Sequence, residues 1–269
     1  MNRVAFNIFG FNVYYYSLCI LLGVIVAYIL ITREGKKQGL TKEFTSDLIF
    51  YTLIIGILGA RVYYCVFNLD YYLANPSEIL KIYNGGLAIH GGVIAGLIFV
   101  YFYTKKKNVS FIKILDIVAP AVIIAQSFGR WGNFFNQEAH GGITTYQNLK
   151  NMHIPEFIIN GMHIEGKYYY PTFFFESIWC LIGFIILMIA RKNKNLRKGF
   201  QIGFYFIWYG IGRFFIEALR TDSLMFFNLK IAQIVSLIGI IIGIIIIVTN
   251  RNKKYYNEME VKWWFMTLL

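Results

Sequence analysis

The chain has 269 residues, of which 57% are apolar, 19% are aromatic and only 15% are charged. A soluble globular protein usually carries about a quarter charged residues, because they cover its surface, so this composition argues against an ordinary soluble enzyme. It also excludes a disordered chain, which requires low hydrophobicity. The formal net charge of +12 is compatible with nucleic-acid binding only if the charges cluster accordingly.

Long apolar runs recur along the whole chain and predict membrane-spanning helices. Each has roughly 18–22 residues, the length that crosses a hydrocarbon core of ~30 Å with all backbone groups bonded inside the helix. The first run is too long for a signal-peptide core and further runs follow it, so we interpret it as a membrane helix. We therefore predict an all-α integral membrane protein with about seven transmembrane helices in a single domain, residues 1–269. The predicted spans are Val13–Thr32, Ser46–Phe67, Gly86–Thr104, Phe111–Phe128, Thr172–Ala190, Gln201–Ala218 and Ile231–Thr249.

The basic residues between these spans predict the orientation. The first, third and fifth connections and the C-terminal tail hold 17 of the 26 Lys and Arg, and the opposite side holds five. The positive-inside rule places the N-terminus outside and the C-terminus, a short tail at about 250–269, in the cytoplasm. Topology and attraction to anionic lipid account for the net charge, so no nucleic-acid partner is expected. The longest connection, at about 139–170, is predicted outside as a lid or partner-binding element.

Neither the cysteines nor the histidines show the spacing of a metal site. The cysteines, Cys19, Cys65 and Cys180, lie singly inside apolar runs and are interpreted as packing residues. The four histidines lack a metal-ligand pattern such as H-E-x-x-H. No metal and no cofactor is expected.

Several charged residues lie within or at the ends of the predicted spans. An Arg at the centre of a membrane helix costs about 2.5–3.5 kcal/mol, so such side chains usually face the bundle interior or a polar cavity. In the predicted topology most of them lie towards the outer face, as does His90, which favours a polar cavity that opens outward. These charged residues are Arg61, Arg130, Arg213, Arg220, Glu138, Glu176 and Glu217.

The most informative segment, residues 129–141, reads GRWGNFFNQEAHG and follows the fourth apolar run. Glycines on both sides of Arg130 permit a bend and a close approach to a ligand. Arg130 itself could donate two parallel hydrogen bonds to a phosphate or carboxylate. The alternative is a polar helix end whose arginine extends to the water interface, and the residues alone leave both interpretations open.

Two further segments contain polar residues in apolar surroundings. His90 lies between two glycine pairs that would clear space around it, and an imidazole accepts protons near neutral pH; a structural or substrate-orienting role is the alternative. Four residues spaced by four, four and three line one helix face, with more positive than negative charge, which suits an anionic ligand. The alternative for this stripe is a self-neutralising contact between helices. Its residues are Tyr209, Arg213, Glu217 and Arg220.

At these residues the sequence resembles the bacterial prolipoprotein diacylglyceryl transferases, essentially over its whole length. Residues 129–141 match the family signature G-R-x-G-N-F-x-N-x-E-x-x-G at every defined position, and the His-Gly-Gly and Tyr-x-x-x-Arg-x-x-x-Glu-x-x-Arg patterns are also present. The P-x-x-x-x-E pattern fits Pro171 and Glu176, and the first-span tyrosine falls on Tyr16. Tyr170 replaces an expected His and Ser17 an expected Gly, which puts local substrate contacts in doubt.

The resemblance implies a reaction in the bacterial cytoplasmic membrane. The diacylglyceryl group of phosphatidylglycerol would move to the thiol of the signal-peptide cysteine of a prolipoprotein, which forms a thioether and releases glycerol 1-phosphate. Arg130 and Arg213 would hold the phosphate, and His90 or Tyr16 would assist thiol deprotonation; these four are the expected catalytic residues. Asn133 and Tyr209 would fix the head group, and three glutamates would orient the cations. The expected phosphatidylglycerol site comprises Arg130, Asn133, Asn136, Glu138, Gly141, Glu176, Tyr209, Glu217 and Arg220.

An outward-facing transporter or lipid-binding protein for an anionic solute is the alternative from another class. It too would place Arg and Glu beside a polar cavity. Transporters often contain internal repeats, whereas neither the GRWGN nor the IHGG segment has a second copy in this chain. The transferase is therefore the preferred hypothesis.

Overall fold

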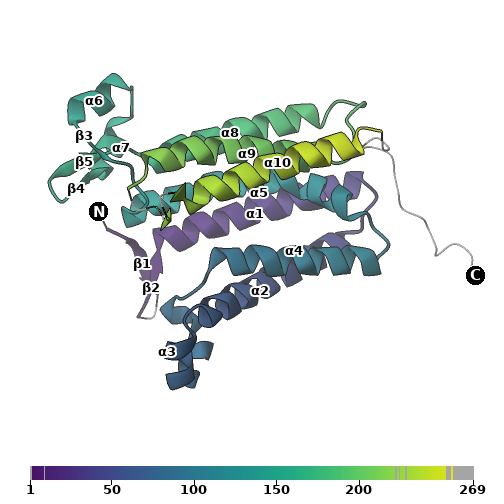
Figure 1. Cartoon of the computed structure of the whole chain (residues 1–269), viewed down its shortest axis with the longest axis horizontal. Coiled ribbons are helices and arrows are strands. Elements are labelled where there is room, and N and C mark those ends of the chain that lie inside the picture. Colours follow the sequence, from purple (N-terminus) through teal and green to yellow (C-terminus); the bar gives the residue numbers. More distant parts are fainter. Residues whose placement is uncertain are drawn as a thin grey trace, which may run out of the picture. The chain divides into compact units, whose positions relative to one another are not determined.

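The computed structural model is mostly helical and describes residues 2–8, 10–221, 223, 225–227, 229–252 and 256 (Figure 1). Apart from residues 250–252 and 256, the predicted tail lies outside the described residues. The chain divides into two compact units. Unit 1 comprises the described residues of Met1–Ile31 and Leu115–Glu258, and unit 2 comprises Thr32–Ile114. A single membrane domain remains a prediction.

Each predicted apolar run corresponds to a helix, and the structure extends several of them, although Val13 and Tyr14 lie in a strand and residues 86–88 precede the third of these helices. Among the described residues, six helices are long and apolar enough to cross a membrane. The third predicted span corresponds to α4 (Ile89–Lys106), which is not one of the six because His90 and two terminal lysines lower its mean hydropathy. The chain is thus a mostly helical multi-pass membrane protein, while seven spans and their orientation remain predictions. The six helices are α1 (Tyr15–Lys37), α2 (Lys42–Val66), α5 (Phe111–Asn136), α8 (Thr172–Ala190), α9 (Phe200–Leu219) and α10 (Ile231–Asn250).

The fourth predicted span ends too early. It was expected to stop at Phe128 before a bend, but α5 continues to Asn136, so Arg130 lies inside the helix. The glycine at position 132 allows close packing instead of a bend: a Cβ there would lie 2.6 Å from the ring of Tyr16. Helix α5 therefore brings the signature segment against the first turn of α1, within unit 1.

The mostly helical structure is consistent with the all-α prediction, and short strands and helices supplement the long helices. An antiparallel hairpin, β1 (Val4–Ile8) and β2 (Phe11–Tyr14), precedes α1. A second hairpin, β6 (Met225–Phe226) and β7 (Leu229–Lys230), precedes α10. Such two-residue strands carry too little hydrophobic alternation to be recognised from sequence.

The predicted outer connection is a small folded element. Its three strands form an antiparallel sheet in the order β3-β5-β4. Its hydrophobic core includes Phe134 from α5 and Phe173 from α8, whose rings stack with centroids 4.7 Å apart. The element is therefore anchored on the two helices that end and begin beside it. Its parts are β3 (Ile143–Thr144), α6 (Tyr146–Asn151), α7 (Glu156–Gly161), β4 (His163–Ile164) and β5 (Lys167–Tyr169).

Aromatic and glycine contacts set the positions of α8, α9 and α10 in unit 1. Trp179 and Trp208 stack with centroids 4.3 Å apart, and each indole N–H donates to the other residue's backbone carbonyl (2.8 and 2.9 Å). Between α9 and α10, a Cβ on Gly203 would lie 2.8 Å from the carbonyl oxygen of Gly243. The tryptophan pair aligns α8 with α9, so that Glu176 faces the polar stripe on α9.

In unit 2, α2 packs closely against α4. A Cβ on Gly59 would lie 2.8 Å from the carbonyl oxygen of Gly91. The buried guanidinium of Arg61 in α2 donates to the backbone carbonyls of Glu78 (2.5 Å), Ile79 (3.0 Å), Gly85 (2.8 Å) and Gly86 (2.9 Å). These bonds fasten the segment before α4, which comprises α3 (Leu69–Ala74) and the 3₁₀ turns Pro76–Leu80 and Ile82–Asn84.

Candidate active site

Glu176, in the second turn of α8, connects three helices in unit 1. One carboxylate oxygen lies 2.8 Å from Arg130 Nη2 on α5 and accepts a hydrogen bond from the Tyr209 hydroxyl (3.1 Å) on α9. The other oxygen lies 3.0 Å from Arg213 Nη1 on α9. The Glu176 side chain is only 3% exposed. A buried carboxylate needs such charged partners to offset the loss of its hydration.

Glu217 forms a second anionic centre, one turn after Arg213 on α9. Its carboxylate lies 2.6 Å from Arg213 Nη2 and 3.9 Å from Arg220 Nε. Arg213 therefore bridges the two buried carboxylates, of which its spacing predicts only the pair with Glu217 within α9. The α9 stripe is thus a connected ion-pair network rather than a row of independent charges.

Lys230 of β7 is a member of this region that the sequence reasoning missed. Its ammonium donates to the carbonyls of Glu217 and Arg220 (2.7 Å each) and of Ala218 (3.3 Å). These carbonyls lie at or just after the C-terminal end of α9, where the last carbonyls of a helix lack i+4 amide partners. In the sequence Lys230 is only a basic residue before an apolar run, so no local signal distinguished it.

The signature residues occupy the last turns of α5 and the segment just after it. Arg130 donates to the Asn133 amide oxygen (3.4 Å), and Asn133 donates to Glu138 (2.9 Å). Asn136 also donates to Glu138 (3.3 Å). Glu138 thus accepts hydrogen bonds from both amides, and Asn133 connects it with Arg130; its role in orienting the cations stays a prediction.

Gly141 joins the folded connection to the end of α9. It pairs with Arg220 in an isolated β-bridge, and its N–H donates to the Tyr170 carbonyl (2.9 Å). A Cβ at this position would lie 2.7 Å from the Tyr170 Cβ. The absence of a side chain is therefore explained by backbone packing, whereas a contact with phosphatidylglycerol stays a prediction.

The two candidate bases lie in different units. Tyr16 of α1 belongs to unit 1, where its ring packs against Gly132, two residues after Arg130 in the signature. His90 belongs to unit 2, is exposed, and has its ring 6.4 Å from that of Tyr63. The glycines after His90 were expected to clear space around it; Gly91 instead permits the close packing of α4 on α2.

Polar contacts continue one helical turn from Arg130 into the apolar part of unit 1. Gln126 donates to the Tyr205 hydroxyl (3.0 Å), and the Ser127 hydroxyl donates to the Ser177 carbonyl (2.9 Å). The Tyr205 ring stacks on that of Tyr209 with an interplanar angle of 5°. Gln126 and Ser127 precede Arg130 by four and three residues, and this spacing on one helix face was the signal that could have identified them.

The cluster presents fixed positive charge in a largely buried setting. Four cations, Arg130, Arg213, Arg220 and Lys230, accompany three carboxylates, Glu138, Glu176 and Glu217, which leaves one excess positive charge. The arginine side chains are 14–23% exposed, so they are partly accessible to a ligand. Within the described part of the chain, no three His, Cys, Asp or Glu side chains gather into a set that could hold a metal ion.

Apolar helices around a buried Arg–Glu network define a polytopic membrane protein with a site suited to an anionic group. The family model for prolipoprotein diacylglyceryl transferase matches residues 3–249. Relatives named phosphatidylglycerol--prolipoprotein diacylglyceryl transferase from Bacillus cereus and Bacillus anthracis are 49% and 48% identical over 262 residues. Each alignment covers 96% of this chain and 97% of the relative. The chain belongs to the prolipoprotein diacylglyceryl transferase family and is a transferase.

Proposed function

We propose that the protein transfers the diacylglyceryl group of phosphatidylglycerol to the thiol of the signal-peptide cysteine of prolipoproteins in the bacterial cytoplasmic membrane. Family membership and the names of the relatives support the reaction and both substrate classes. The observation that supports the site most strongly is the pairing of Arg130 and Arg213 with one buried carboxylate, Glu176. This pairing holds two guanidinium groups in position before any substrate arrives.

The reaction has a charge change that suits these arginines. The cysteine sulfur attacks the glyceryl carbon that bears the phosphate ester, a C–S bond forms and the C–O bond breaks with its electron pair on the phosphate oxygen. The phosphodiester of the lipid carries one negative charge, whereas the released phosphate monoester carries about −1.5 to −2 at pH 7. Fixed cations in a water-poor site therefore bind the departing group more strongly than the substrate, which lowers the barrier.

The main polar residues of the site have proposed roles in this step. Arg130 and Arg213 hold the phosphate and Asn133 and Tyr209 fix the head group. Three glutamates orient the cations: Glu138, Glu176 and Glu217. A free thiol has a pKa near 8.5 and is mostly protonated at neutral pH. Its proton therefore has to leave before or during attack, and His90 and Tyr16 remain the two candidates that accept or orient it. The positive cluster additionally favours the thiolate.

The test uses purified protein in detergent with phosphatidylglycerol and a synthetic signal peptide that contains the acceptor cysteine. Mass spectrometry should detect diacylglyceryl on that thiol, and a Cys→Ser peptide should give none. Arg130→Ala should lose activity, whereas Lys167→Gln, an exposed change in β5, should retain it. If folded protein retains phosphatidylglycerol but makes no adduct, the transferase proposal is wrong, and a flux assay would test transport instead.

A further inference from the structure

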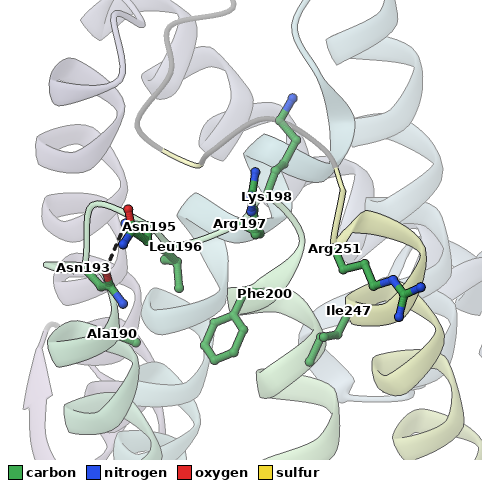
Figure 2. A pocket seen from close by; sticks show the side chains of 9 residues that line it. All are labelled: Ala190, Asn193, Asn195, Leu196, Arg197, Lys198, Phe200, Ile247 and Arg251. Carbon is green, nitrogen blue, oxygen red and sulfur yellow. Dashed lines mark hydrogen bonds between the residues drawn. The ribbon is translucent and has the colours of Figure 1, made fainter.

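A cavity of about 290 Å³ lies where α8 and α10 end and α9 begins (Figure 2). Figure 2 shows Phe200 and Ile247 towards its helical side and the connecting segment with Arg197 and Lys198 above them. Ala190 at the end of α8 and Arg251 after α10 also line it. The cavity therefore combines an apolar wall from three helices with a basic rim.

This cavity is separate from the candidate active site. Glu176 and Ala190 are 14 residues apart on α8. A helix rises 1.5 Å per residue, so the two regions lie about 20 Å apart along the helix axis. That distance is most of the thickness of a hydrocarbon core. The cavity lies at the end of unit 1 for which the basic residues predict a cytoplasmic location.

We propose that this cavity binds the glycerol-phosphate head group of an anionic phospholipid. Its volume is near the lower limit of small-molecule sites, which suits a head group rather than a whole lipid. The exposed Arg251 and the partly exposed Arg197 on its rim complement a phosphate, Lys198 beside them is 6% exposed, and none of its nine lining residues is acidic. Basic pockets beside membrane helices are a known physical solution for binding anionic lipid head groups.

The acyl chains of such a lipid have an apolar surface to follow. Ile189 on α8 is 62% exposed, and Ile244 and Val248 on α10 are 49% and 54% exposed. These side chains precede the cavity on the helices whose ends form it. In a membrane they face hydrocarbon, so a lipid can place its phosphate in the cavity while its chains remain in the bilayer.

Next to the cavity wall, hydrogen bonds connect α5, α8 and α9. Arg191, next to Ala190, donates to the backbone carbonyls of Asp116 (3.0 Å) and Ile117 (3.2 Å) on α5 and to the Gln201 side chain (3.1 Å) on α9. Asp116 accepts the N–H groups of Gly199 (2.5 Å) and Ile202 (3.0 Å) at the start of α9. A bound lipid therefore stabilises the ends of the same three helices that position Arg130, Glu176 and Arg213. This inference does not depend on the proposed reaction.

The chain offers a matched control for the test. Lys192 and Lys194 lie in the same α8–α9 connection, are exposed and do not line the cavity. Replacing them removes as much positive charge as replacing Arg197 and Arg251. Diffuse attraction to an anionic membrane predicts equal effects of the two pairs, whereas a specific site predicts an effect of the lining pair alone.

Native mass spectrometry of the full chain in detergent measures retained dioleoyl phosphatidic acid against dioleoyl phosphatidylcholine. The Arg197→Gln/Arg251→Gln pair should reduce retained phosphatidic acid about fivefold, and the Lys192→Gln/Lys194→Gln pair less than about twofold. Ala190→Phe, which fills the cavity and keeps every charge, should also reduce retention. If the double variant does not fold, Arg251→Gln alone replaces it in the comparison and should also reduce retained phosphatidic acid.

Equal losses from the two charge pairs would overturn the proposal in favour of diffuse surface charge. It is also wrong if Ala190→Phe and Arg251→Gln both retain phosphatidic acid as the unmodified protein does, or if phosphatidylcholine binds equally well. Transferase activity of the same variants in detergent is measured in parallel. If the variants are active and retain as much phosphatidic acid as the unmodified protein, the lipid site is contradicted and the proposed function is unaffected.

Discussion

Replacement of Glu176 by Gln tests whether the buried carboxylate organises the candidate site. The carboxylate accepts from Arg130, Arg213 and Tyr209. Gln keeps one oxygen for these donors but directs an NH₂ group at a guanidinium. Removal of one partner from a buried ion pair costs about 3–5 kcal/mol. Because the two arginine side chains are 23% and 15% exposed, water offsets part of that loss, and we expect about 2–4 kcal/mol.

Thermal unfolding in detergent measures this effect. For a chain of this size, 1 kcal/mol changes the Tm by about 2–4 °C, so Glu176→Gln should lower it by about 4–16 °C. Transferase kcat/KM should fall by more than about tenfold at a temperature where the variant is folded, because Arg130 and Arg213 lose their common anchor.

Glu217→Gln is the matched comparison, because Glu217 is as buried as Glu176, while its ion pairs among the described residues are with arginines in α9 and directly after it. Its effect on the Tm should be the smaller of the two. A Tm for Glu176→Gln equal to or above that of Glu217→Gln would refute the argument that the contacts across three helices dominate. Unchanged kcat/KM in Glu176→Gln would refute its positioning role.

Four further predictions each concern the replacement of one residue. Gly132→Ala should cost about 1–3 kcal/mol in stability by overpacking against a tyrosine ring, whereas Gly142→Ala, with nothing within 4 Å of its Cβ, should leave the Tm unchanged. His90→Gln should retain transferase activity and His90→Ala lose it if the imidazole only orients a group; loss of activity in both variants points to a proton acceptor. Asp116→Ala removes the cap at the start of α9 and should lower stability by about 1–2 kcal/mol, measured as a Tm decrease relative to the unmodified protein. Arg61→Lys provides fewer donors for four carbonyls, so limited proteolysis should cut the 76–86 segment faster; an unchanged rate contradicts this.

Residue patterns within one helix were predicted well from sequence. The spacing of Arg213, Glu217 and Arg220 predicted one helix face, and the structure joins them in ion pairs. The end of α5 was predicted wrongly because Gly129 and Gly132 are poor helix formers in isolation. In the folded chain Gly132 packs against Tyr16, a contact between distant residues that no local propensity contains.

The folded connection at 139–170 illustrates a second limit. Its strands have two or three residues each, too few for a hydrophobic period to be recognised. Their pairing depends on a core that includes Phe134 and Phe173 from two long helices. Lys230 was missed for a related reason, because its partners are backbone carbonyls of α9, which every sequence possesses.

By itself the sequence determined the helical membrane class, the approximate spans and the identity of the polar residues, because apolar run length, helical spacing and the cost of buried charge are local properties. Only the tertiary structure decided which partners those residues have. Glu176 meets Arg130 across 46 positions of the chain and also pairs with Arg213, and these contacts together require α5, α8 and α9 to pack at one alignment. The stacked Trp179 and Trp208 set the alignment of α8 with α9. Such contacts depend on the shapes of side chains from separate helices, and shape complementarity between distant segments exists only in the folded chain.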